Sequence, residues 1–101
     1  MNIYRIYTEK KDPEWIAGQV AMFFDAFTIL EGTGYWKGTR EDCLIIELIV
    51  SADRWVDVEL VAERIRKGNK QEAVLVTDQP ITTELIEAAP DIHDATGQGR
   101  C

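Results

Sequence analysis

The feature that most constrains the fold is the segment FTILEGTGYWKGTREDCLIIELIV at residues 27–50. It contains two strand-like runs joined by a connection over residues 37–42. The second run, residues 43–50, is the most continuously apolar segment of the chain and is interrupted once, by Glu47. Because burying an unpaired carboxylate is costly, Glu47 must reach solvent, a cationic partner or a ligand.

Hydrophobic periodicity predicts the remaining elements. Residues 2–8 and 27–36 alternate as strands do, and residues 71–77 are expected to form the fourth strand. Two amphipathic helices separate the strands, one starting at the Asp12 cap and one ending near Lys67. The apolar stripe expected on the first helix comprises Ile16, Val20, Phe23, Phe24 and Phe27. The stripe expected on the second helix comprises Trp55, Val58, Val61, Ala62 and Ile65.

The order strand, helix, strand, strand, helix, strand is typical of an α+β protein with the ferredoxin-like, or split β-α-β, fold. We therefore expect a four-stranded antiparallel sheet with both helices on one face and strand order 4-1-3-2. This domain is expected to span residues 1–79. Residues 80–101 are expected to form a C-terminal extension, with a short helix at 83–89 docked by Leu85 and Ile86, followed by a flexible acidic tail.

Composition argues against nucleic-acid and membrane partners. The chain has 11 Lys and Arg against 18 Asp and Glu, a net charge of −7, which is the wrong sign for neutralising phosphates. The N-terminus lacks the apolar stretch of a signal peptide, and no run has the length of a membrane span. We therefore expect a cytoplasmic protein. The two cysteines, Cys43 and Cys101, have no metal-binding spacing, so no metal or other cofactor is predicted.

The third predicted strand has two unlike faces, and the mixed one leads to a candidate site. The apolar face, expected to lie against the helices, comprises Leu44, Ile46, Leu48 and Val50. The opposite, open face comprises Cys43, Ile45, Glu47 and Ile49. In the expected strand order, the first and third strands are neighbours at the centre of the sheet. Arg5 should therefore lie beside Glu47 on this open face, and an ion pair is expected there. The candidate ligand-binding residues are this pair and its predicted neighbours: Arg5, Tyr7, Tyr35, Trp36, Ile45 and Glu47.

An open face that mixes isoleucine, tyrosine and one ion pair is too apolar to leave in water. It is expected to be covered by a second copy, by the C-terminal tail or by a partner. Three interpretations stay open: an ion pair inside a homodimer interface, a small-molecule pocket, or a solvated pair.

No catalytic residue is predicted. The only histidine, His93, lies in the expected tail, and no Ser-His-Asp or Cys-His set can be assembled around it. Glu47 could act as a general acid or base if burial raised its pKa, but Arg5 beside it would lower that pKa. The glycines of residues 31–35 are followed by neither a Gly-Lys-Ser/Thr motif nor a helix start, which disfavours a phosphate-binding loop.

The segments FTILEGTGYWKG, EDCLIIELI and QEAVLV resemble a pattern found in short, uncharacterised bacterial and phage or mobile-element proteins with a ferredoxin-like fold. The resemblance spans residues 2–77. It implies a fold and no particular activity.

Two functions compete on this basis. The first is a non-enzymatic binding or interaction module that dimerises through its open sheet face and binds a small molecule or a host protein. The second is a small dimeric enzyme of the α/β-barrel type whose pocket is the same face. A third interpretation makes the acidic chain a nucleic-acid mimic that blocks a basic site on another protein.

Overall fold

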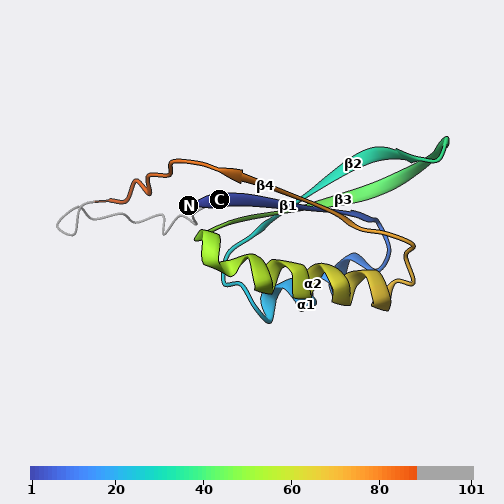
Figure 1. Ribbon diagram of the computed structural model, residues 1–101, viewed down its shortest axis with the longest axis horizontal. Helices are drawn as coiled ribbons and strands as arrows, with labels where there is room; N and C mark the ends of the chain where they lie inside the picture. Colours follow the sequence, from blue (N-terminus) through green and yellow to red (C-terminus); the bar gives the residue numbers. More distant parts are fainter. Residues whose placement is uncertain (89–101) are drawn as a thin grey trace.

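The computed structural model describes residues 1–88 and confirms the predicted fold (Figure 1). Its elements are β1 (Asn2–Glu9), α1 (Pro13–Ala21), β2 (Thr28–Trp36), β3 (Thr39–Val50), the 3-10 turn η1 (Ala52–Arg54), α2 (Trp55–Gly68) and β4 (Leu75–Pro80). The strands form one antiparallel sheet in the order β2-β3-β1-β4, and Figure 1 shows both helices on the same side of it. Neither described helix is long and apolar enough to cross a membrane.

The hydrophobic core lies between the sheet and the two helices. On β3, Leu44, Ile46 and Leu48 are at most 2% exposed, as their alternation predicts. They meet fully buried residues of the helices, among them Ile16 and Ile65. Each such side chain stabilises the fold by about 1.5–3 kcal/mol through removal from water, so this face of the sheet carries most of the hydrophobic stabilisation.

The first apolar stripe extends beyond its helix. Helix α1 ends at Ala21, so the prediction that the stripe through Phe27 is helical was wrong. The segment after the helix still packs on the core, with Phe24 only 3% exposed. Arg54 holds this segment in place, because its Nη2 donates a hydrogen bond of 2.7 Å to the Phe23 carbonyl and its guanidinium lies 4.6 Å from the centre of the Phe24 ring.

Trp55 is also placed differently from the prediction. It is the first residue of α2 and is 50% exposed, whereas it was expected on the inner stripe of that helix. It lines a shallow cleft of about 320 Å³ together with Asn2, Tyr4 and Asp78. The other four residues of the predicted stripe are buried. The difference arises because the preceding 3-10 turn shifts the start of the α-helix to Trp55, at the rim of the sheet.

The β2–β3 hairpin is longer than predicted. Strand β3 begins at Thr39, whereas residues 37–42 were expected to form a connection. The turn consists of Lys37 and Gly38, whose φ angles are +50° and +81°, and two positive φ angles in a two-residue turn favour tight antiparallel pairing. The hairpin therefore projects beyond the helices (Figure 1).

The C-terminal part of the described chain also departs from expectation. Strand β4 begins at Leu75 and not at Gln71. Residues 81–88 contain no helix, and Leu85 and Ile86 are 58% and 84% exposed, so they do not dock a helix there. The predicted acidic tail, which contains His93 and Cys101, lies outside the described residues.

Candidate functional site

The predicted ion pair is present on the open face of the sheet. Arg5 and Glu47 are direct partners in the β1–β3 register, and Arg5 Nε donates a hydrogen bond of 2.9 Å to Glu47 Oε2. The two side chains are 33% and 24% exposed. The hydrogen bond to Glu47 raises the pKa of Arg5 above its ordinary value. The ion pair therefore lies, partly exposed, at the surface of the uncovered face.

Apolar side chains surround this pair. Tyr7 and Ile45 are direct partners one step along the same strands and are half-buried. Leu30 of β2 is the register partner of Ile45 and is 45% exposed, and Ile49 of β3 is 48% exposed. Neither helix covers this side of the sheet, as Figure 1 shows. The open face is thus an apolar surface with a neutral ion pair near its centre.

A cleft of about 400 Å³ lies at the hairpin end of the open face. Its walls come from the end of β1, the β2–β3 hairpin and the loop before β4. The residues that line it supply aromatic rings, carboxylates and one thiol: Tyr7, Trp36, Glu9, Glu41, Glu72 and Cys43. Tyr35 also borders the cleft, although its register places its side chain on the opposite face of β2. We call it the hairpin cleft. Walls that are mostly apolar with a few polar groups are typical of small-molecule sites.

The structure separates the six predicted site residues into two groups. Arg5, Ile45 and Glu47 lie at the centre of the open face and do not line the hairpin cleft. Tyr35 and Trp36 line the hairpin cleft, 71% and 47% exposed, near the tip of the hairpin. Tyr7 lines the cleft and also neighbours the ion pair. The candidates therefore do not form one pocket around Glu47.

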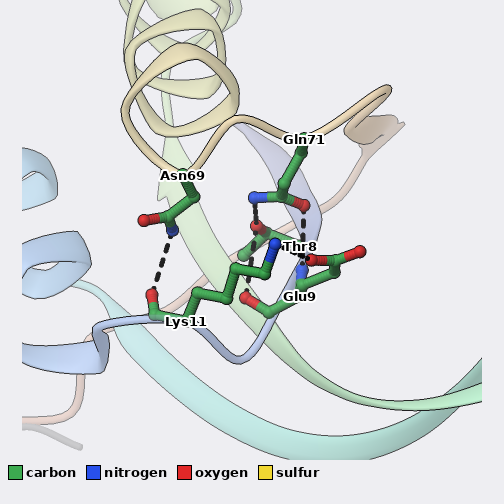
Figure 2. Close-up of polar contacts among 5 residues, drawn as sticks. All are labelled: Thr8, Glu9, Lys11, Asn69 and Gln71. Carbon is green, nitrogen blue, oxygen red and sulfur yellow. Dashed lines mark hydrogen bonds and ion pairs between the residues drawn. The ribbon is translucent and has the colours of Figure 1, made fainter.

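Gln71 anchors the loop that forms one wall of the hairpin cleft (Figure 2). Its side chain is buried, with Nε2 donating to Thr8 Oγ1 at 2.5 Å and Oε1 accepting from the Glu9 backbone N–H at 3.1 Å. The β1–β4 register ends at Tyr7 and Leu75. Gln71 thus forms hydrogen bonds to β1 beyond the end of the β1–β4 pairing. The sequence predicts that Gln71 lies in the fourth strand, and the local pattern contains no signal for this anchoring role.

A second set of contacts joins the loop to the hairpin tip. Glu72 accepts hydrogen bonds from Trp36 Nε1 at 3.3 Å and from Lys37 Nζ at 2.9 Å. Lys37 Nζ also lies 5.6 Å from the centre of the Trp36 ring. The hydrogen bond from Lys37 lowers the pKa of Glu72, and the hydrogen bond from Trp36 lowers it further. These exposed contacts close the outer side of the cleft, and each is of the weak, salt-sensitive kind.

The remaining two carboxylates of the cleft differ in environment. The ion pair with Lys11, whose Nζ lies 2.9 Å from Glu9 Oε2, lowers the pKa of Glu9 (Figure 2). Burial raises the pKa of Glu41, and the neighbouring carboxyl group of Glu9 raises it further. Within residues 1–88, Glu41 forms no ion pair, and no group of three or more His, Cys, Asp or Glu is arranged to hold a metal ion.

No protein-family model and no curated protein sequence matches the chain. Solved structures match it in fold. A DUF3240 family protein from Shewanella baltica OS155 has a TM-score of 0.71 at 10% identity, covering 86% of this chain and 96% of that one. A phage SAM lyase in its apo state has a TM-score of 0.64 at 16% identity, covering 92% of each chain. Such low identities show the shared fold alone, and the two matches agree with the resemblance to small bacterial and phage proteins.

Proposed function

We propose that the chain is a non-enzymatic binding module that forms a homodimer through its open sheet face. The observation that carries the proposal is the Arg5–Glu47 pair set among exposed apolar residues, including Leu30 and Ile49. Contiguous exposed apolar surface typically marks an interaction site. In a two-fold contact the same surface of both copies is covered at once.

A second copy suits this face electrostatically. The chain carries a net charge of −7, which opposes self-association at a distance. At the centre of the open face, however, one arginine neutralises one glutamate. Two copies can therefore meet there without placing like charges opposite each other, which would be unfavourable.

The hairpin cleft supplies the binding function in this proposal. Its aromatic walls attract a cation through the ring faces, and Lys37 already lies over Trp36. Glu41 adds a carboxylate with no cationic partner among residues 1–88. A small organic cation with an apolar body suits both features. The cytoplasmic location and the lack of nucleic-acid binding expected from the sequence belong to the same proposal.

Native mass spectrometry and light scattering of the purified chain test the homodimer. Ile49→Arg places a charge on the open face, and Leu60→Arg is the matched control, because Leu60 is similarly exposed but lies on α2. We expect Ile49→Arg to halve the assembly mass and Leu60→Arg to leave it unchanged. A wild-type monomer at tens of micromolar, or equal behaviour of the two variants, would overturn the open-face contact.

The second candidate is a small enzyme that uses the same face. One observation favours it: the fold is shared with a phage SAM lyase over 92% of both chains, and S-adenosylmethionine is an organic cation of the kind that suits the hairpin cleft. Incubation with S-adenosylmethionine, followed by liquid chromatography and mass spectrometry, separates the candidates. Consumption that is lost in Glu41→Gln favours the enzyme. Binding without consumption favours the module. If S-adenosylmethionine is neither bound nor consumed, it is not a ligand of this chain.

A further inference from the structure

The two edges of the sheet are protected unequally. Strands β2 and β4 are the outer strands. Strand β4 has six residues and contains Asp78 and Pro80, and charge and proline both discourage pairing with another strand. Strand β2 has nine residues and contains neither proline nor a basic residue. Its one charge, Glu31, is held by Lys10 at 2.6 Å.

The β2 edge is exposed as well as long. At alternate residues its backbone N–H and C=O groups point away from β3, as on any edge strand. Three large side chains on it are largely exposed: Leu30 at 45%, Tyr35 at 71% and Trp36 at 47%. Long, apolar and unguarded edges are the ones that accept another strand, so the composition of β2 indicates that this edge is used.

We propose that β2 pairs antiparallel with β2 of a second copy, about a two-fold axis at Gly32. In that register Leu30 faces the partner's Gly34, and Thr28 faces the partner's Trp36, on the open side of the sheet. A large side chain thus meets a small one at each step. On the helix side, Ile29 faces the partner's Tyr35, which is a favourable pair of a β-branched and an aromatic residue.

The same register avoids electrostatic conflict. Glu31 faces the partner's Thr33, so the one charged residue of the strand does not meet its own copy across the axis. Gly32 meets Gly32 of the partner subunit, and neither carries a side chain to hold the backbones apart. Size and charge along β2 are therefore self-complementary about Gly32, which favours a second copy of this chain over an unrelated strand.

This contact is separate from the open-face contact proposed above. The edge contact uses backbone groups in the plane of the sheet, whereas the open-face contact uses side chains perpendicular to it. Both are two-fold contacts, so together they close an assembly of four chains when their axes intersect at right angles, and either alone gives two. The test must therefore identify the edge contact itself and not only the mass of the assembly.

Cross-linking at the axis does this. Gly32→Cys would be made in a Cys43→Ser, Cys101→Ser background, because a Cβ at Gly32 would lie 3.4 Å from Cys43 Sγ and invite a bond within the chain. Directly opposed residues of antiparallel strands have Cα atoms about 4.5–5.5 Å apart, within the range that a disulfide spans. Thr77→Cys in the same background is the control, since Thr77 is exposed on the other edge strand. Thr77 pairs with Arg5 and so lies on the open face, and the two variants are therefore compared with Ile49→Arg present as well.

Mild oxidation should convert Gly32→Cys to a covalent dimer, at concentrations where Thr77→Cys stays uncross-linked. The cross-link should persist when Ile49→Arg is added, because the open-face contact is not needed for it. A cross-link no stronger than the control in a chain with wild-type circular dichroism would overturn the proposal. So would its loss in the presence of Ile49→Arg, which would show that the open face brings the strands together.

A second variant covers the case in which Gly32→Cys does not fold. A Cβ at Gly34 would have only ordinary contacts, the nearest at 3.8 Å, so Gly34→Lys should be accommodated in the folded chain. It puts a lysine opposite the partner's Leu30. Both residues lie on the open face, so the variants are made with Ile49→Arg present, which removes the open-face contact. In that background we expect Gly34→Lys to halve the native mass and Thr77→Lys to leave it unchanged. Equal masses for the two variants would overturn the proposal.

Discussion

The two faces of the central strands β1 and β3 contrast sharply. Toward the helices, Ile6, Ile46 and Leu48 are fully buried. Toward the open side, the neighbouring positions on the same strands hold an ion pair at Arg5 and Glu47. Because successive strand residues point to opposite faces, one short segment serves two purposes. One face stabilises the fold, and the other is free to carry interactions that folding does not require.

The largest expected effect is a loss of stability from a substitution on the helix-facing side of the sheet. Ile46→Ala removes a fully buried side chain and should lower the free energy of unfolding by about 2–5 kcal/mol. Ile45→Ala, its neighbour on the open face, should lower it by about 1 kcal/mol or less, because Ile45 is only half-buried in the single chain. Urea unfolding at low protein concentration measures both. Similar losses for the two variants would contradict the division between the faces.

The next effect concerns the loop that borders the hairpin cleft. Gln71→Ala leaves the Glu9 backbone N–H without its partner, and leaves the Thr8 hydroxyl with only a long contact of 3.5 Å to the Glu9 carbonyl. Unsatisfied buried polar groups cost about 1–3 kcal/mol. Asn69→Ala removes a more exposed hydrogen bond to the Lys11 carbonyl and should cost about 1 kcal/mol or less. If the two losses in urea unfolding were equal, Gln71 would not be the anchor of this loop.

A pH series on Glu41 compares the stability of the fold with ligand binding in the hairpin cleft. Burial and Glu9 raise the pKa of Glu41, so the folded chain holds this proton more tightly than the unfolded chain. Glu41 therefore destabilises the fold increasingly as pH rises from its ordinary pKa through the raised one. Glu41→Gln should be more stable than wild type at neutral pH and equal to it in acid, and it should bind an organic cation more weakly. Glu59→Gln, on the exposed side of α2, is the control.

The smallest expected effect is at the hairpin tip. Glu72→Gln weakens exposed contacts with Trp36 and Lys37 and should leave the midpoint of urea unfolding unchanged. Amide hydrogen exchange at the tip should nevertheless become faster, because fewer contacts then hold it against the loop. Raising the salt concentration should have a similar effect on the wild-type chain. Unchanged exchange in both experiments would show that these contacts do not hold the tip.

Several features could be predicted from the sequence because they depend on local periodicity. The alternation of Leu44, Ile46 and Leu48 is enough to assign the buried face of β3, and the order of the elements is enough to place Arg5 beside Glu47. Trp55 was misplaced because its position depends on the 3-10 turn that precedes α2. Helix periodicity alone cannot show where such a turn ends.

The hairpin cleft could not be predicted as a unit. Its walls combine β1, the tip of the hairpin and the loop before β4, and neither Gln71 nor Glu72 stands out in a polar stretch of sequence. The predicted group around Glu47 was divided because the hairpin is longer than expected, and this carries Tyr35 and Trp36 away from the centre of the face. The length follows from a turn of only two residues with positive φ angles.

The sequence by itself determined the ferredoxin-like fold, the two unlike faces of the sheet and the Arg5–Glu47 pair, because each follows from the spacing of residues along a strand and from the order of the elements. Only the tertiary structure decided which side chains enclose the hairpin cleft. That cleft depends on contacts between segments far apart in the chain, such as Gln71 with Thr8 and Glu72 with Trp36. Such contacts are set by the twist and length of the strands, which local patterns do not specify.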